Sequence, residues 1–253
     1  MLLAIDIGNT NIVFGVFSGK KIVKQWRVST PKTTFQSLPA IKGIDQILIA
    51  SVVPSLDRSL AKLLVKKYGV KPHFVTASNI PGIRIRMRKK NEVGADRVVD
   101  ALAAYKLYGG PVIVVDFGTA TTFDVINAKG DYLGGAIAPG LLLARDALHA
   151  QTAKLPRIEL KAPRSVIGNN TVEAIRSGLV LGYVAMVEGL VRRIKSEYRT
   201  RNTEHGTRNT GVKVIATGGL APLICKQTGI VDIIDDKLTL KGLMLIGKSR
   251  YDI

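Results

Sequence analysis

One short pattern occurs twice in this chain, and the repetition constrains the fold more than any other feature. Residues 3–11 (LAIDIGNTN) resemble residues 113–121 (IVVDFGTAT). In both, an apolar strand runs into Asp-x-Gly, a polar stretch follows, and a second strand begins. Two related units of three strands predict two similar domains that face one another across a cleft. Chance similarity is the alternative, and the agreement of Asp, Gly and the polar stretch together argues against it.

The surrounding periodicity predicts an α/β chain with domains at residues 1–110 and 111–253, which meet near Gly110-Pro111. Alternating and continuous apolar runs predict strands; they lie at 2–7, 11–17, 22–28, 46–52, 72–75, 112–116, 121–126, 131–137 and 212–216. Helical spacing predicts helices; they lie at 55–67, 96–107, 171 to about 197 and 238–248, with another after Pro139. Residues 199–211 are polar and basic, and we expect a surface loop there.

The charge balance is strongly basic, with 37 Lys and Arg against 19 Asp and Glu, a net charge of +18. Such a surplus raises nucleic-acid binding as a hypothesis. A solvated basic surface that attracts phosphorylated or carboxylate ligands is the simpler interpretation. Aromatic residues, which stack on bases, make up 6% of the chain and are not interleaved with the basic runs.

Cysteine usage and hydropathy favour a soluble cytoplasmic protein. Cys225 is the one cysteine, so no internal disulfide forms, and the three histidines have no metal-ligand spacing with it. No uninterrupted apolar run reaches the ~18 residues of a membrane-spanning helix. Asp6 interrupts the apolar N-terminal stretch and no basic segment precedes it, unlike a signal peptide.

The two Asp-x-Gly turns have the chemistry of a nucleotide site. Gly8 and Gly118 lack a Cβ, so the backbone can approach a phosphate closely, and its N–H groups can form an anion-binding nest. We expect Asp6 to hold Mg²⁺, through water, because this ion dehydrates reluctantly and prefers oxygen ligands. An ordinary hairpin with an Asp turn is the alternative for either motif alone. The third turn, 217–219 (TGG), follows another apolar strand. Its glycines have no side chains, so the backbone there could lie against an adenosine.

A second phosphate-binding pattern is misleading. Residues 242–249 (GLMLIGKS) match the P-loop pattern GxxxxGK[ST]. A P-loop needs a preceding strand, a polar exposed loop and a following helix that points at the phosphate. The intervening residues here are apolar, so we assign this segment to a core-facing helix.

Residues 92–97 (EVGADR) are the best catalytic candidate. Asp96, at a predicted helix start, could accept a proton from a substrate hydroxyl. Arg97 could bind an anionic group of the substrate or transition state. The equally balanced alternative is that Asp96 only stabilises the helix N-terminus and pairs with Arg97.

These blocks together resemble type III pantothenate kinases. The matching segments are 6–11 (DIGNTN), 94–97 (GADR), 116–124 (DFGTATTFD), 134–140 (GGAIAPG), 170–171 with 177–178, and 217–219. The resemblance covers nearly the whole chain. It implies the actin-like ATPase fold, two ribonuclease-H-like domains with mixed sheets flanked by helices and ATP in a cleft between them. It also implies ATP-dependent phosphorylation of pantothenate, the first step of coenzyme A synthesis, by a homodimer with shared active sites.

The resemblance carries roles over to individual positions. Asp96 matches the general base for the pantothenate hydroxyl, and Gly94, Ala95 and Arg97 match the substrate-binding run around it. Thr171 matches a separate pantothenate contact made across the dimer. Asp116 matches the ligand of a monovalent cation, K⁺ or NH₄⁺. The ATP-binding positions are Asp6, Ile7, Gly8, Asn9, Thr10, Asn11, Ile12, Val13 and Thr119.

Two rival functions stay open at this point. A kinase-derived nucleic-acid-binding or regulatory protein would use the basic surface. A related kinase for another small hydroxyl substrate is the second, because residues 87–91 (MRKKN) depart from the Tyr and Asn-Pro pair usual there in the family. The three aspartates Asp6, Asp96 and Asp116 favour an enzyme, since binding alone does not require all three.

Overall fold

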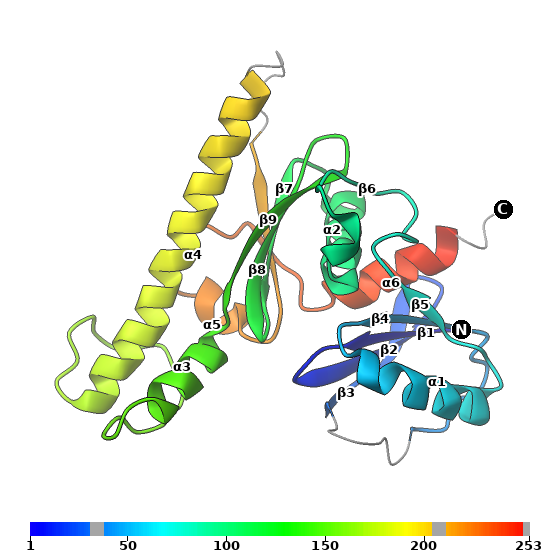
Figure 1. Cartoon of the computed structure of the whole chain (residues 1–253), viewed down its shortest axis with the longest axis horizontal. Helices are drawn as coiled ribbons and strands as arrows, with labels where there is room; N and C mark the ends of the chain where they lie inside the picture. Colours follow the sequence, from blue (N-terminus) through cyan, green and yellow to red (C-terminus); the bar gives the residue numbers. More distant parts are fainter. Residues whose placement is uncertain (31–37, 204–210, 250–253) are drawn as a thin grey trace. The chain divides into compact units, whose positions relative to one another are not determined.

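The computed structural model describes residues 1–30, 38–203 and 211–249, and their contacts divide the chain into two compact units (Figure 1). The first unit comprises Met1–Tyr108, Gly130–Tyr132 and the chain from Lys237. The second comprises Gly109–Lys129 and Leu133–Asp236. Each unit is built on one mixed sheet.

The sheet of the first unit has the strand order β3-β2-β1-β4-β5. The five strands are β1 (Leu2–Ile7), β2 (Asn11–Ser18), β3 (Lys21–Ser29), β4 (Gln46–Ser51) and β5 (His73–Val75). The first three pair antiparallel, whereas β4 lies parallel to both β1 and β5. Five of the six residues of β1 are buried, as expected of a central strand covered on both faces.

Helix α1 (Pro54–Tyr68) covers one face of this sheet. Leu56, Leu60 and Leu64 recur at helical spacing and pack in a core that includes Leu3, Ile5 and Ile7. The helix begins with a proline and ends at Gly69, whose φ of +70° allows its N–H to bond to the Val65 carbonyl at 2.9 Å.

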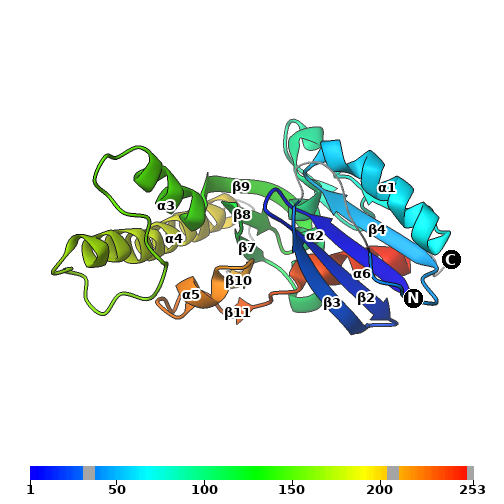
Figure 2. The ribbon, with the colours of Figure 1, turned by 90° about the horizontal axis from the view of Figure 1, so that it is seen from below.

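Helices α2 (Ala95–Tyr108) and α6 (Leu238–Ser249) pack against one another and against the same sheet (Figure 2). A Cβ at Gly242 of α6 would lie 2.6 Å from the Val99 carbonyl oxygen of α2, so only glycine allows this close helix packing. The compact units therefore differ from the predicted domains, because the apolar α6 packs with the first unit and not with the second. The segment that mimics a P-loop is the buried part of this helix, which confirms the expected core-facing helix.

The second sheet repeats the topology of the first. Its order is β11-β10-β7-β8-β9-β6, so β9-β8-β7-β10-β11 corresponds to β3-β2-β1-β4-β5. The strands are β7 (Val112–Phe117), β8 (Ala120–Ile126), β9 (Asp131–Pro139), β10 (Lys213–Thr217), β11 (Ile233–Ile234) and β6 (Arg84–Ile85). The predicted internal repetition is thereby confirmed at the level of strand order.

Three helices pack on one face of the second sheet: α3 (Leu141–Ala150), α4 (Thr171–Thr203) and α5 (Ala221–Cys225). Their shared core joins Val180, Val184, Val187 and Val191 of α4 to the strands. A short 3₁₀ helix, Lys90–Glu92, and the strands β6 and β11 were not predicted.

The expected loop at 199–211 is wrong at its start, because α4 continues to Thr203. Ion pairs spaced four residues apart, Glu188 with Arg192 and Glu197 with Arg201, stabilise the charged C-terminal half of this helix. Residues 204–210 lie outside the described residues. Among the described residues, one helix, Thr171–Arg201, has the length and the apolar composition that crossing a membrane would require.

The α2–α6 contact yields a stability prediction. Gly242→Ala should lower the free energy of unfolding by about 1–3 kcal/mol, because the new methyl group overlaps the Val99 backbone. Gly189→Ala is the matched helical control, since nothing lies within 4 Å of its Cβ position. The control should raise stability by up to about 1 kcal/mol through helix propensity. Chemical denaturation of both variants measures the difference, and equal effects would contradict the proposed close packing.

Candidate active site

The first part of the site lies at the carboxyl ends of β1 and β4. Asp6 is half-buried near the end of β1, and strand alternation places it on the sheet face opposite Ile5 and Ile7, the face where α2 and α6 pack. Directly after β4, the Val52 N–H donates to the Ile7 carbonyl at 3.0 Å. Loops at such ends are where open α/β sheets bind ligands.

The β1–β2 turn is held in shape by its own backbone and by the end of β3. The Gly8 N–H donates to the Asn11 carbonyl at 3.0 Å. Thr30 donates its hydroxyl to the Gly8 carbonyl at 2.6 Å and its N–H to the Thr10 carbonyl at 2.9 Å. Asn9 and Thr10 are exposed at the tip. Ile7 and Ile12, which the sequence analysis assigned to ATP binding, are fully buried, so their side chains belong to the core.

Residues 94–97 start α2 beside these strand ends. The Cβ position of Gly94 lies 3.8 Å from Val52 Cγ1, and Ala95 is buried. Asp96 is half-buried and accepts a hydrogen bond at 2.8 Å from the Arg97 N–H, which fixes the orientation of its carboxylate. The Arg97 guanidinium lies 6.0 Å from the ring centroid of the buried Tyr132. A carboxylate and a cation thus lie next to the turn that follows Asp6.

In the second unit, Asp116 occupies the position in β7 that Asp6 occupies in β1. It pairs with Thr217 of the parallel strand β10, which leads into Gly218. Gly218 has a φ of +90°, and a Cβ there would overlap the Asp116 carboxylate and the Phe117 backbone. Gly140 is equally constrained, because a Cβ would overlap the Thr119 carbonyl to which its own N–H donates at 3.0 Å. The backbones of Gly140 and Gly218 therefore pack directly against the β7–β8 turn that follows Asp116.

Tyr183 of α4 is the functional candidate that sequence reasoning missed. It is 7% exposed, and its hydroxyl hydrogen-bonds to the hydroxyl of Thr121, in β8. Burial raises the pKa of Tyr183 above its usual value, and the Asp116 charge acts in the same direction, so the phenol stays protonated at neutral pH. A tyrosine in a helix face otherwise made of valines was the available signal, since a buried hydroxyl needs a partner.

Thr171 lies elsewhere in the second unit, at the start of α4. It lines a cavity of about 580 Å³ with residues of α3, α4 and the segment that joins them. The cavity residues are Leu148, Leu155, Gly168, Asn169, Asn170, Thr171, Ala174, Ile175, Gly178 and Leu179. Helix α3 connects the two regions: it starts after Gly140 near Thr119 and ends beside the cavity, about 15 Å away along ten residues.

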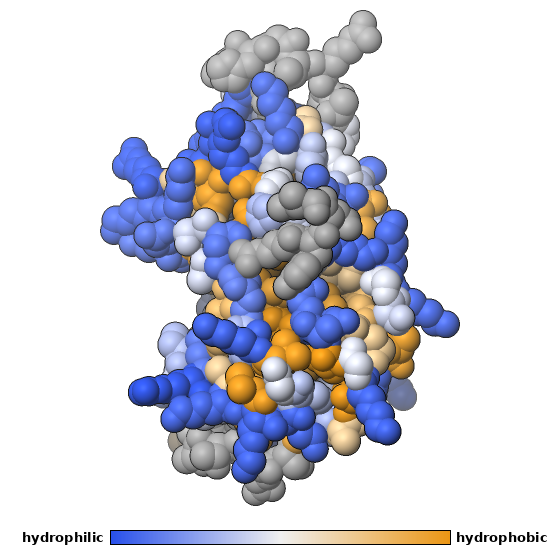
Figure 3. Space-filling model, turned by 90° about the vertical axis from the view of Figure 1, so that its right-hand side faces the viewer, coloured by the Kyte–Doolittle hydropathy of each residue, from blue (hydrophilic) through white to orange (hydrophobic). Residues whose placement is uncertain are grey.

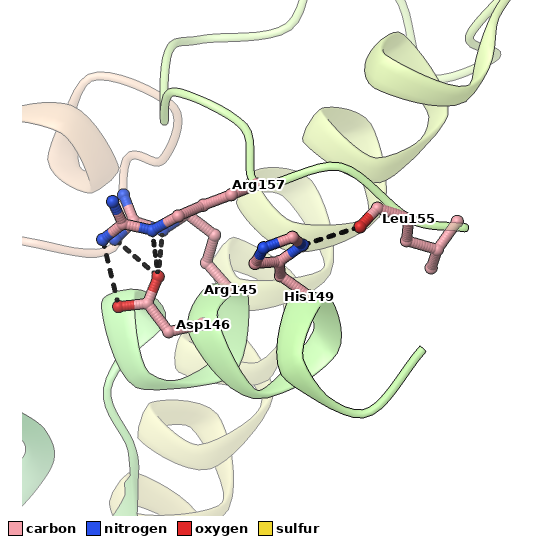
Figure 4. Close-up of polar contacts among 5 residues, drawn as sticks. All are labelled: Arg145, Asp146, His149, Leu155 and Arg157. Atoms are coloured by element: carbon pink, nitrogen blue, oxygen red, sulfur yellow. Dashed lines mark hydrogen bonds and ion pairs between the residues drawn. The ribbon is translucent and has the colours of Figure 1, made fainter. Parts of the chain in front are cut away.

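Charged side chains join α3 to the segment that follows it (Figure 4). Arg157 donates to Asp146 at 2.9 Å, and Arg145 donates to the same carboxylate at 2.8 Å. One turn further, His149 Nδ1 lies 2.8 Å from the Leu155 carbonyl. These bonds fix the wall of the cavity next to Leu148.

Acidic, histidine and cysteine side chains do not assemble into a three-ligand metal cluster anywhere in the described residues. Burial raises the pKa of the Cys225 thiol to about 11, so this cysteine is protonated at neutral pH and is a poor nucleophile.

Comparison with known proteins decides the family. A model of the family "Type III pantothenate kinase" matches residues 2–193. The chain belongs to the type III pantothenate kinase family. It is 44% identical over 260 residues to the type III pantothenate kinase of Moorella thermoacetica. The aligned residues cover 97% of this chain and 98% of that kinase. The type III pantothenate kinase of Paramagnetospirillum magneticum is 45% identical over 264 residues, covering 99% and 98%.

Solved structures agree on the fold. The activator of the 2-hydroxyisocaproyl-CoA dehydratase from Clostridium difficile, solved with bound ADPNP, superposes with a TM-score of 0.54 at 13% identity. The superposition covers 100% of this chain and 97% of the activator. Two mixed sheets flanked by helices and this likeness confirm the predicted actin-like fold class. The cleft between the domains stays a prediction, as do the individual residue roles.

The Asp146 network yields a prediction on pH dependence. The hydrogen bond from Arg157, reinforced by Arg145, lowers the pKa of Asp146 from 3.8 to about 2. The folded-state pKa is depressed, so the stabilisation is present above pH 3.8 and is lost as the pH falls towards 2. Asp146→Asn and Arg157→Gln should each weaken the fall in thermal unfolding midpoint between about pH 4 and 2. An unchanged pH dependence in both variants would contradict the ion pairs.

Proposed function

We propose that this protein transfers the γ-phosphate of ATP to the primary hydroxyl of pantothenate. The observation that carries the proposal is the half-buried Asp96, held by the Arg97 N–H at the start of α2 beside the carboxyl ends of β1 and β4. Membership of the type III pantothenate kinase family supports it. The related kinase for another hydroxyl substrate is the rival to test, and the comparisons do not favour a nucleic-acid-binding protein.

In this mechanism Asp96 is the general base. Its carboxylate accepts the proton of the substrate hydroxyl while the hydroxyl oxygen attacks the γ-phosphorus, and the bond to the ADP oxygen breaks. The peptide dipoles at the start of α2 favour the charged carboxylate. Arg97 lies next in the chain, where its cation offsets negative charge on the substrate carboxylate or the transferring phosphoryl group.

ATP binding is assigned to the two corresponding turns. The exposed tip Asn9-Thr10 after Asp6 offers N–H and side-chain donors to phosphate, as does Thr119 after Asp116. Gly8 and Gly118 carry no Cβ, so a phosphate can approach the backbone closely at these two positions. Turns of this kind contribute positioning and charge neutralisation, which are the main requirements of phosphoryl transfer.

The residues present fit the two implied ions. Asp6 is a half-buried carboxylate beside the β1–β2 turn, to which phosphate binding is assigned. Mg²⁺ is usually bound by one or two carboxylates, water and substrate phosphate. Asp116 is a half-buried carboxylate with the Gly218 backbone beside it, and its single charge suits a monovalent cation, K⁺ or NH₄⁺. Bound there, these cations would neutralise phosphate charge.

The proposed homodimer uses the apolar surface around the start of α4. Val166 and Ile167 are 74% and 80% exposed, and the Val166 carbonyl accepts a hydrogen bond from Ser177 of α4 at 2.6 Å. On α4, Gly178, Gly182 and Ala185 are exposed small residues that let another backbone approach closely. A second copy of the chain that covered this surface would also reach Thr171. The apolar length of α4 then reflects a protein interface, and we propose a cytoplasmic location.

The catalytic assignment is tested with Asp96→Asn. Removal of the base should lower kcat for ATP-dependent phosphorylation of pantothenate by about 10²–10⁴-fold. Asp236→Asn is the control, because it removes an exposed carboxylate just before α6. A coupled ADP-release assay with Mg²⁺ and K⁺ measures turnover on pantothenate and on a panel of other small alcohols. Wild-type turnover on another alcohol alone would exclude pantothenate as the substrate.

The interface is tested by a charge in the exposed apolar patch. Light scattering of the wild type should give twice the chain mass of 27.3 kDa. Ile167→Asp should shift the protein towards 27.3 kDa, because a carboxylate buried in an apolar interface is strongly unfavourable. Val23→Asp is the matched control on β3, where Val23 is 51% exposed. A wild-type monomer, or a dimer insensitive to Ile167→Asp, would contradict the proposed surface.

A further inference from the structure

We propose that Tyr183 is a positioning residue that holds the Gly118–Ala120 turn in its nucleotide-binding shape. The inference rests on the proposed assignment of Thr119 to ATP binding. In this proposal Tyr183 does not touch the substrate and affects nucleotide binding only through the turn.

The turn closes between two paired residues, Phe117 at the end of β7 and Thr121 in β8. Tyr183 contacts both. Its ring lies 6.3 Å from the Phe117 ring at an interplanar angle of 51°, and its hydroxyl hydrogen-bonds to Thr121 Oγ1. Phe117 and Thr121 are 2% and 0% exposed. One side chain of α4 therefore fixes both ends of the turn from the buried side.

The same hydroxyl also reaches the third segment at the turn. The backbone of Leu141, the first residue of α3, acts on this phenol and lowers its pKa, against the larger effect of burial. The preceding Gly140 donates its N–H to the Thr119 carbonyl at 3.0 Å. The path from Tyr183 through Leu141 and Gly140 thus ends at the carbonyl of Thr119, the residue assigned to ATP. A network of this kind restricts where the Thr119 backbone and side chain can lie.

A tyrosine hydroxyl is suited to holding a turn by hydrogen bonds. Such a hydroxyl can donate one hydrogen bond and accept others at the same time, which a phenylalanine cannot do. Loss of the hydroxyl leaves Thr121 and Leu141 without this partner in a buried place, so the turn should sample other shapes. The consequence should appear in nucleotide affinity, because the phenyl ring of a Tyr183→Phe variant would still fill the core.

The central experiment compares Tyr183→Phe with the wild type. We expect the KM for ATP and the dissociation constant for Mg·ADP, measured by calorimetry, to rise about 3- to 10-fold, as befits one buried hydrogen bond. The KM for pantothenate and kcat should change less than about 2-fold. Thr121→Val should give the same result, Thr121→Ser should retain wild-type affinity, and the double variant should show no further loss.

Tyr68→Phe is the matched control for a merely structural effect. Tyr68 also has a pKa raised by burial, and its hydroxyl donates to the Pro39 carbonyl at 2.7 Å in the first unit. Both Tyr→Phe variants should lower the thermal midpoint, but Tyr68→Phe should leave the KM for ATP unchanged.

Two results would overturn the inference. One is unchanged nucleotide affinity in Tyr183→Phe and Thr121→Val; the other is an equal loss of affinity in Tyr68→Phe. Wild-type turnover on pantothenate tests the proposed function separately, since calorimetry with Mg·ADP needs no phosphate acceptor.

Discussion

The parallel pairing beside each hairpin is the constraint on which the rest of this structure depends. In the first sheet Asp6 pairs with Ala50, and in the second Asp116 pairs with Thr217. Because parallel strands end at the same edge of a sheet, the chain that leaves β4 or β10 must pass the Asp-x-Gly turn. Everything assigned to phosphoryl transfer, including the start of α2, lies along such an edge. The strand order therefore decides which loops can contribute to a site.

Close backbone approach is the second requirement, and glycine meets it at Gly218 and Gly140. Both positions lie so close to the β7–β8 turn that a methyl group would displace the Asp116 carboxylate or the Thr119 carbonyl. A loop packed in this way has few alternative shapes, and a preorganised turn binds phosphate without paying for its ordering during the reaction. Tyr183 of α4 restricts the same turn from the core side, because it contacts Phe117 and Thr121 at the two ends of the turn.

Helix α4 has two different faces, one packed on the sheet of the second unit and one exposed. Its valines and Tyr183 face the sheet of the second unit, whereas Gly178, Gly182 and Ala185 remain exposed. The proposed dimer surface and the β7–β8 turn are thus connected to opposite sides of a single rigid element. On the face in Figure 3, hydrophilic side chains surround a central hydrophobic area.

The sequence by itself determined the repeated hairpins, the positions of Asp6, Asp96 and Asp116, and the rejection of the apparent P-loop, since these depend on local apolar periodicity and on glycine. It did not determine that α6 packs with the first unit, that α4 continues to Thr203, or that β6 joins the second sheet. Only the tertiary structure decided that Tyr183 meets Phe117 and Thr121, or that Gly218 touches Asp116. Such contacts join residues about 60 to 100 positions apart, and the packing of whole helices and sheets selects them, whereas periodicity reports only which face of one element is buried.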